Sequence, residues 1–83
     1  MQAREWTRNA LMALGFRVLE SRANFLFAAP PHMGGKEYLE ALRKKNILVR
    51  HFDSPRTKDF VRITIGSMEQ MERLIEVTKE LMQ

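Results

Sequence analysis

The chain has 83 residues, which suffices for one small domain but leaves little volume to enclose a deep active site. It carries 14 Lys and Arg against 10 Asp and Glu, and this modest excess of positive charge suits an acidic ligand or nucleic acid without identifying either. Cysteine is absent, which excludes disulfides and thiolate metal sites. The longest apolar run, Phe25–Ala29, is too short to cross a bilayer, and the N-terminus lacks the order of a secretory signal. We therefore expect a cytoplasmic protein with no membrane partner.

The first half of the chain predicts one helix followed by two strands. Apolar residues recur at helical spacing over Ala3–Leu14, and Gly15 stands where a left-handed C-terminal cap belongs. Phe16–Leu19 is typical of a short strand, Glu20–Asn24 of a polar turn, and Phe25–Ala29 of a more buried strand.

The second half predicts a helix, a β-hairpin and a final helix. Glu37–Lys45 has one apolar face and ends in cations, as a helix C-terminus favours. The hairpin pairs Ile47–Phe52 with Phe60–Ile65. Ser67 and Gln70 have the spacing of a capping box and begin a helix that runs to the end of the chain. The order α-β-β-α-β-β-α predicts a single α+β domain over residues 1–83, a small sheet covered by helices on one side.

The hairpin places two arginines on one face of the sheet. In both strands aliphatic residues alternate with other residues, so each strand has one aliphatic face. If these faces coincide, the antiparallel register that pairs Val49 with Ile63 also puts Arg50 opposite Arg62. Like charges directly across a ladder are unfavourable, and a bound carboxylate or phosphate between the guanidiniums explains the arrangement. The alternative is two solvated arginines that pair with nearby acids such as Asp53 or Asp59.

The residue pattern predicts no catalytic or metal-binding residue. His32 and His51 are the only histidines, and their context is not typical of a metal site. The serines lack the nucleophile-elbow context, and Gly34–Lys36 lacks the upstream glycine and the following Ser or Thr of a phosphate-binding loop.

A second hypothesis is a stand-alone binding module for an acidic small molecule or RNA, which would use the same sheet face without catalysis. Small basic α+β domains can stack bases on exposed aromatic side chains. Against RNA, the chain has no RNP1-like run, and we expect only Phe52 and Phe60 as aromatics on the arginine face. Nucleic acid is therefore not the expected partner.

Four short segments occur in one order and spacing across the chain, Gly15–Val18, Ser21–Phe27, Asn46–Arg50 and Val61–Ser67. Together they closely resemble the C-terminal small domain of histidinol-phosphate aminotransferases. These are pyridoxal-phosphate (PLP) enzymes of fold type I that exchange an amino group between histidinol phosphate and 2-oxoglutarate in histidine biosynthesis. The resemblance spans essentially the whole chain.

The resemblance implies roles for three residues. Arg62 matches the arginine of the family's R-I-T-x-G motif and would bind the acidic group of the amino-group donor or acceptor. Arg50 matches a second arginine and would help to hold an anion such as the substrate phosphate. Asn24 matches the family's A-N-F motif, where we expect only support of the backbone.

Two departures from the family pattern are small. Leu19-Glu20 stands where a proline often precedes Ser21, and Ser67 replaces the usual threonine. They leave open a related branch, such as threonine-phosphate decarboxylases or other aminotransferases of the subgroup.

The larger departure is the absence of the large domain, which in the family supplies the Schiff-base lysine, the aspartate facing the pyridine nitrogen and the phosphate cup. The lysines of this chain lie in polar contexts that do not suit the Schiff-base role. We therefore expect part of a longer enzyme that is catalytically silent alone and binds no PLP by itself. Its expected partners are the large domain, an acidic substrate (histidinol phosphate, glutamate or 2-oxoglutarate) and, for the parent enzyme, a second copy in a homodimer.

Overall fold

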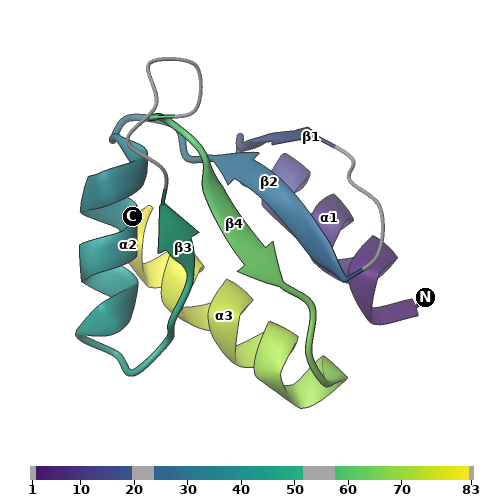
Figure 1. Ribbon diagram of the computed structural model, residues 1–83. Coiled ribbons are helices and arrows are strands. Elements are labelled where there is room, and N and C mark those ends of the chain that lie inside the picture. The colour runs from purple at the N-terminus through teal and green to yellow at the C-terminus, as the bar shows by residue number, and fades with distance from the viewer. Residues whose placement is uncertain (1, 20–23, 52–57, 83) are drawn as a thin grey trace.

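The computed structural model describes residues 2–19, 24–51 and 58–82. Within these residues the elements follow the predicted order (Figure 1): α1 (Gln2–Ala13), β1 (Arg17–Leu19), β2 (Phe25–Ala29), α2 (Gly35–Arg43), β3 (Arg50–His51), β4 (Val61–Thr64) and α3 (Met68–Leu81). Most of the predicted turn Glu20–Asn24, together with Phe52 and most of the connection after it, lies outside the described residues. No helix in the described part of the chain is long and apolar enough to span a membrane.

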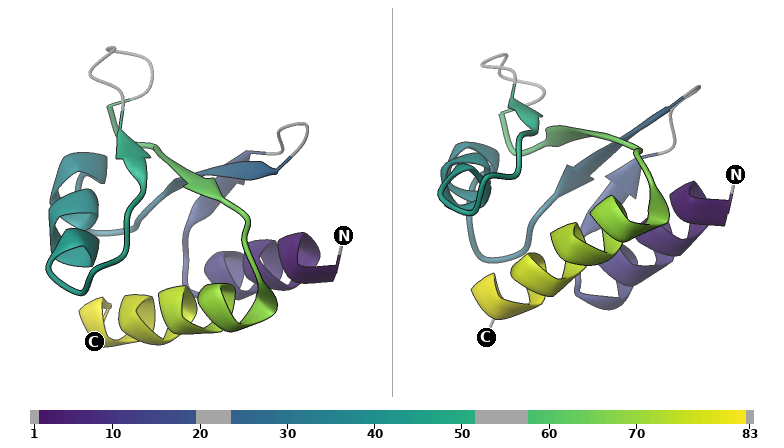
Figure 2. Two further views of the ribbon diagram at one scale, coloured as in Figure 1. Left: turned by 60° about the horizontal axis from the view of Figure 1, so that its bottom comes forward. Right: turned by 90° about the horizontal axis from the view of Figure 1, so that it is seen from below.

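The strands form one antiparallel sheet in the order β1-β2-β4-β3. Leu26 and Ala28 of β2 and Val61 and Ile63 of β4 point to one face and are buried there. Figure 2 shows α1 and α3 beneath this face, with α2 beside the β3 edge. The predicted sheet with helices on one side is confirmed, and the opposite face is left uncovered by helices.

The first helix ends as its glycine predicts. Gly15 has a φ of +93°, in the left-handed region where a side chain is strained. The N–H of Phe16 donates to the carbonyl of Leu11 at 3.1 Å and that of Gly15 to Met12 at 3.0 Å, which together form a Schellman motif. This turn sends the chain from α1 into β1 and buries Phe16 in the core.

The second helix ends in the same way, and this shortens the next strand. Asn46 has a φ of +63°, and the N–H of Ile47 donates back to the carbonyl of Leu42 at 3.0 Å. Ile47 therefore completes the helix cap, and regular pairing with β4 begins only at Arg50. The predicted strand Ile47–Phe52 is wrong in its extent at this end, although the register it implied is correct.

The last helix begins at the predicted capping box. The N–H of Gln70 donates to Oγ of Ser67 at 3.1 Å, and the N–H of Ser67 donates to Oε1 of Gln70 at 3.0 Å. These two bonds satisfy backbone donors that the first helical turn leaves free. Along the helix one stripe of side chains is buried in the core, where α3 packs against α1 and α2: Met71, Leu74, Ile75, Val77 and Thr78.

A buried hydroxyl pair joins α2 to α3. Thr78 Oγ1 donates to the carbonyl of Leu74 at 2.7 Å, so its single proton is used and the hydroxyl of Tyr38 donates to Thr78 Oγ1, also at 2.7 Å. The ring of Tyr38 also contacts Phe16 edge to face, with centroids 5.2 Å apart. Burial, which disfavours the charged phenolate, raises the pKa of Tyr38 to about 12. Tyr38 is therefore a packing residue that is held neutral.

The start of α2 packs tightly against the end of the β3–β4 connection. A Cβ on Gly35 would lie 2.9 Å from the carbonyl oxygen of Lys58 and 3.0 Å from Cδ2 of His51. Nε2 of His51 lies 2.6 Å from the same carbonyl oxygen, so this histidine has a structural contact. Gly34, one residue earlier, has open space around it. The glycine at position 35 is thus required by the close approach of two backbone segments.

Candidate anion-binding face of the sheet

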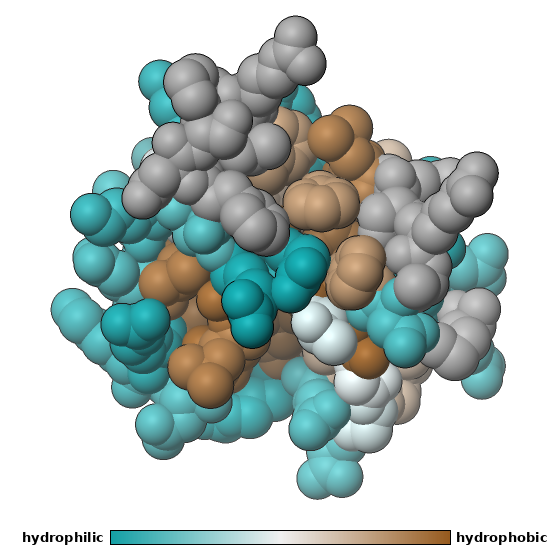
Figure 3. Space-filling model, in the orientation of Figure 1, coloured by the Kyte–Doolittle hydropathy of each residue, from teal (hydrophilic) through white to brown (hydrophobic). Residues whose placement is uncertain are grey.

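The uncovered face of the sheet carries one row of side chains that crosses all four strands. The register aligns Leu19 with Phe27, Phe27 with Arg62, and Arg62 with Arg50. Figure 3 looks onto this face and shows hydrophilic side chains next to apolar ones at its centre. The row is apolar on β1 and β2 and cationic on β4 and β3. Such a surface suits a ligand that has an anionic group.

The predicted pairing of the two arginines is confirmed. Arg50 and Arg62 are direct Cα partners in the antiparallel β3–β4 ladder, where opposed Cβ atoms lie about 4.5–5.5 Å apart. Arg50 is exposed and Arg62 is half-buried. Two cations at this spacing repel each other, and an anion that both contact removes the repulsion. Planar guanidiniums favour carboxylate and phosphate oxygens in this role.

Two aromatic rings lie under arginines of this face. The guanidinium carbon of Arg62 is 4.8 Å from the ring centroid of Phe25, and that of Arg17 is 5.4 Å from the ring centroid of Phe60. Both distances are within the range of cation–π attraction. Phe25 lies on β2 and Arg62 on β4, whereas Arg17 lies on β1 and Phe60 immediately precedes β4, so the packing of neighbouring segments of the sheet sets both contacts.

The expectation that only Phe52 and Phe60 share the arginine face was wrong. Phe27 is the cross-strand partner of Arg62, and Phe25 lies on the same face of β2. The sequence contained the signal, because Phe25 and Phe27 alternate with Leu26 and Ala28, but the face became clear only from the pairing of β2 with β4. Phe52 lies outside the described residues.

The arginine face is open in the described part of the chain. A hollow of about 320 Å³ lies near the β4–α3 connection, lined by residues that include Leu48, Gly66 and Arg73. Neither Arg50 nor Arg62 borders it. The chain thus presents its cationic pair on a surface, and a second surface is needed to enclose a small substrate.

Comparison with known proteins identifies the family. A family model described as aminotransferase class I and II matches residues 1–77. The chain belongs to this family. The resemblance that the sequence motifs indicated is confirmed.

Among curated relatives of this aminotransferase chain, histidinol-phosphate aminotransferase 1 of Bradyrhizobium diazoefficiens is 54% identical over 71 residues, which are 86% of this chain and 20% of that protein. Histidinol-phosphate aminotransferase 1 of Methylococcus capsulatus is 43% identical over 81 residues, 98% of this chain and 23% of that protein. The chain therefore spans about a fifth of the length of these relatives.

The fold is shared with solved aminotransferase structures. The crystal structure of the histidinol-phosphate aminotransferase from Clostridium acetobutylicum superposes with a TM-score of 0.86 over 98% of this chain and 25% of that one. The sequences are 22% identical there, so this likeness concerns the fold alone.

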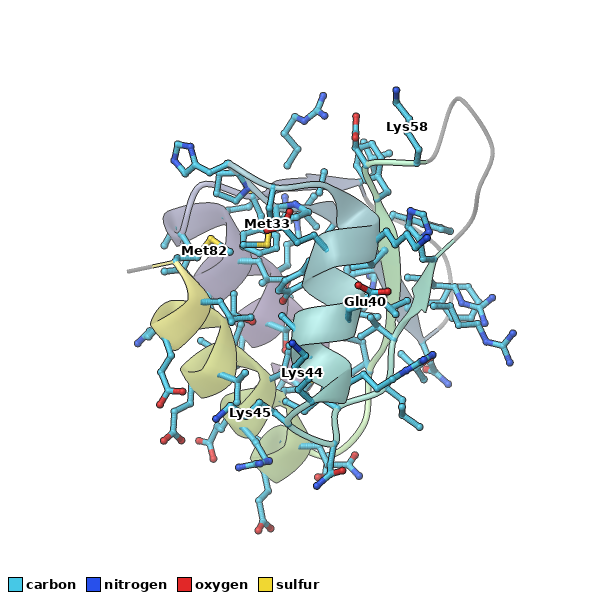
Figure 4. All side chains as sticks on the ribbon, turned by 90° about the vertical axis from the view of Figure 1, so that its left-hand side faces the viewer. Met33, Glu40, Lys44, Lys45, Lys58 and Met82 are labelled. Atoms are coloured by element: carbon cyan, nitrogen blue, oxygen red, sulfur yellow. The ribbon has the colours of Figure 1, made fainter. Side chains whose placement is uncertain are left out.

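The family depends on PLP, but the residues of this chain do not fit a PLP site. Every lysine of the chain is exposed: Lys36, Lys44, Lys45, Lys58 and Lys79. Figure 4 shows Lys44, Lys45 and Lys58 at the surface on the side of α2. A Schiff-base lysine needs a desolvated environment that favours its neutral form. None of these lysines has one, so no catalytic step is assigned to this chain.

The remaining predicted residues have structural contacts or lie apart from the arginine pair. The carbonyl oxygen of Asn24 accepts the N–H of Ile65 at 2.5 Å and extends the pairing between β2 and β4, which agrees with a backbone role. His32 is exposed, and no metal-binding group of three His, Asp or Glu occurs within the described residues. Asp59 is exposed, and Asp53 lies outside the described residues, so pairing of the arginines with these acids stays a prediction.

Proposed function

We propose that this chain is the substrate-anion-recognition part of a histidinol-phosphate aminotransferase, and that Arg50 and Arg62 bind the acidic groups of its substrates. The observation that carries the proposal is their direct opposition in the β3–β4 ladder on the uncovered face. Identity of 54% and 43% with histidinol-phosphate aminotransferases supports the choice of enzyme.

Arg62 suits the carboxylate of the amino-group donor or acceptor. It is half-buried and lies over an aromatic ring, so its guanidinium is less hydrated than that of an exposed arginine. A planar guanidinium can donate two parallel hydrogen bonds to one carboxylate. The exposed Arg50 lies beside it and adds a second charge for the phosphate of histidinol phosphate.

The rest of the enzyme would supply the cofactor and the opposite wall of the site. Bound PLP supplies the electron sink through which an amino group leaves one substrate and enters the next. This chain would bind and orient the anionic end of each substrate against that centre. Closure of this face over the substrate would also exclude water from the site.

The test is the change of Arg62 to Ala in the full-length enzyme. Because charge-assisted hydrogen bonds are lost, we expect KM to rise roughly 10- to 100-fold for both the histidinol phosphate and the 2-oxoglutarate half-reactions. Arg17→Ala is the matched control, because Arg17 lies on the same face over a different ring. Its KM values are expected to stay within about 3-fold of wild type. Equal kinetics of the Arg62 and Arg17 variants would refute the proposal.

The product identifies the reaction class. The full-length enzyme is incubated with histidinol phosphate and 2-oxoglutarate, and separately with threonine phosphate. Formation of glutamate in the first mixture supports the proposal. Release of CO₂ from threonine phosphate without glutamate formation in the first mixture would assign the related decarboxylase branch instead.

A further inference from the structure

Phe25 contacts Arg62 diagonally across two strands. The direct partner of Phe25 in the β2–β4 ladder is Thr64, two residues beyond Arg62 on the same face of β4. The ring reaches back over this diagonal, and its centroid lies 4.8 Å from the guanidinium carbon of Arg62. Phe27 is the direct partner of Arg62, so two aromatic residues of β2 flank the arginine.

The ring contact and anion binding use different parts of the guanidinium. A cation–π contact uses the face of the planar group, whereas hydrogen bonds to carboxylate or phosphate use the N–H groups at its edge. Nε of Arg62, where the guanidinium joins the aliphatic part of the side chain, is buried. Arg62 of β4 therefore lies between the ring of Phe25 on β2 and the guanidinium of Arg50 on β3.

The aromatic contact also offsets the repulsion between Arg50 and Arg62 and the freedom of the long Arg62 side chain. Repulsion by Arg50 favours conformers in which Arg62 turns away, and a long side chain has many conformers available. Attraction to the ring face favours one orientation before the substrate arrives. A site that is organised in advance binds more tightly because less ordering remains to be done on binding.

We propose that Phe25 is a positioning residue for Arg62, and that its ring sets the affinity of the intact enzyme for the carboxylate of its acidic substrate. This inference rests on the proposed function of Arg62. A desolvated cation–π contact corresponds to roughly a 3- to 30-fold difference in binding. Phe25 touches the arginine and acts through it.

The experiment compares three variants of the full-length aminotransferase. Phe25→Leu keeps an apolar side chain and removes the ring, whereas Phe25→Tyr keeps the ring. Phe60→Leu is the matched control, since it removes a half-buried ring of the same face that lies under Arg17 instead. For each enzyme, KM and kcat for 2-oxoglutarate and the temperature of unfolding are measured.

We expect Phe25→Leu to raise KM roughly 3- to 30-fold with kcat within about 2-fold of wild type, and Phe25→Tyr to restore the wild-type KM. A merely structural role predicts a lower unfolding temperature with unchanged KM, as expected for Phe60→Leu. Equal KM values for Phe25→Leu and Phe60→Leu would overturn the inference. If Phe25→Leu does not fold, Phe25→Met replaces it with the same two outcomes, because methionine adapts to irregular packing.

The same assay separates this inference from the proposed function. If Arg62→Ala raises KM and Phe25→Leu does not, Arg62 binds substrate without help from the ring. If neither Arg62→Ala nor Phe25→Leu changes KM, the proposed function of Arg62 is itself refuted.

Discussion

The change of Tyr38 to Phe is predicted to alter stability in opposite directions at neutral and alkaline pH. At neutral pH the variant loses the hydrogen bond from Tyr38 to Thr78, while Thr78 keeps its bond to the carbonyl of Leu74 and the ring keeps its contact with Phe16. We expect the free energy of unfolding to fall by about 1 kcal/mol, the usual contribution of one hydrogen bond.

Alkaline pH reverses the comparison because the buried phenol resists ionisation. The pKa of Tyr38 is about 12 in the folded chain, against the ordinary value of 10.0 for a tyrosine in the unfolded chain. The stabilisation by the neutral phenol is complete below pH 10 and is lost as the pH rises toward 12, since only the unfolded chain then releases the proton. The loss reaches about 1.4 kcal/mol at about pH 11. The wild type and the variant should therefore be equally stable near pH 11, and the variant more stable above it.

The assay is urea unfolding of both chains at several pH values from about 8 to about 12, followed by the fluorescence of the single tryptophan, Trp6. Contributions from lysines cancel in the difference between the two chains. The chain has one tyrosine, so the absorbance of tyrosinate also follows Tyr38 directly. Parallel stability curves for the two chains, or a tyrosinate midpoint near pH 10 in the folded chain, would refute the reasoning.

Further substitutions test other contacts by the same unfolding assay. Gly35→Ala should lower the free energy of unfolding by roughly 1–3 kcal/mol, since the new Cβ would meet backbone atoms. The control Gly34→Ala should stay within about 1 kcal/mol of wild type. Equal effects of the two substitutions would show that the close approach at Gly35 does not limit packing. Ser67→Ala should cost about 1 kcal/mol through loss of the capping box, and Ser67→Asp should restore it. Arg50→Thr should raise the free energy of unfolding by roughly 0.2–1 kcal/mol at low salt, because it removes the repulsion between Arg50 and Arg62. This gain should shrink in high salt, which screens the repulsion. A gain that is independent of salt would contradict this cause.

The sequence predicted the register of the arginine pair because a strand has only two faces. Once the aliphatic side of each strand is assigned to the core, the antiparallel pairing of Val49 with Ile63 leaves Arg50 opposite Arg62, and the structure has this register. The capping box at Ser67 and the left-handed Gly15 were predictable for a similar reason, since both depend on neighbours within one turn.

The features that were missed depend on contacts between distant segments. The pairing of β2 with β4 joins residues about 36 positions apart, and only this pairing places Phe25 beside Arg62. The requirement for glycine at position 35 comes from the backbone near Lys58. The short β3 reflects competition for the N–H of Ile47, which the end of α2 uses first. None of these contacts follows from local propensity.

The row of side chains across the sheet also has a consequence for the order in which the domain folds. Arg50 and Arg62 belong to one hairpin and are closer in sequence than β2 and β4, so they meet at a lower entropic cost, whereas the ring of Phe25 arrives only when the distant strand β2 joins β4. The two positive charges can therefore meet before the aromatic ring is in place. During that interval the hairpin is opposed by its own arginines, and a dissolved anion that binds between them would speed the closure of the sheet.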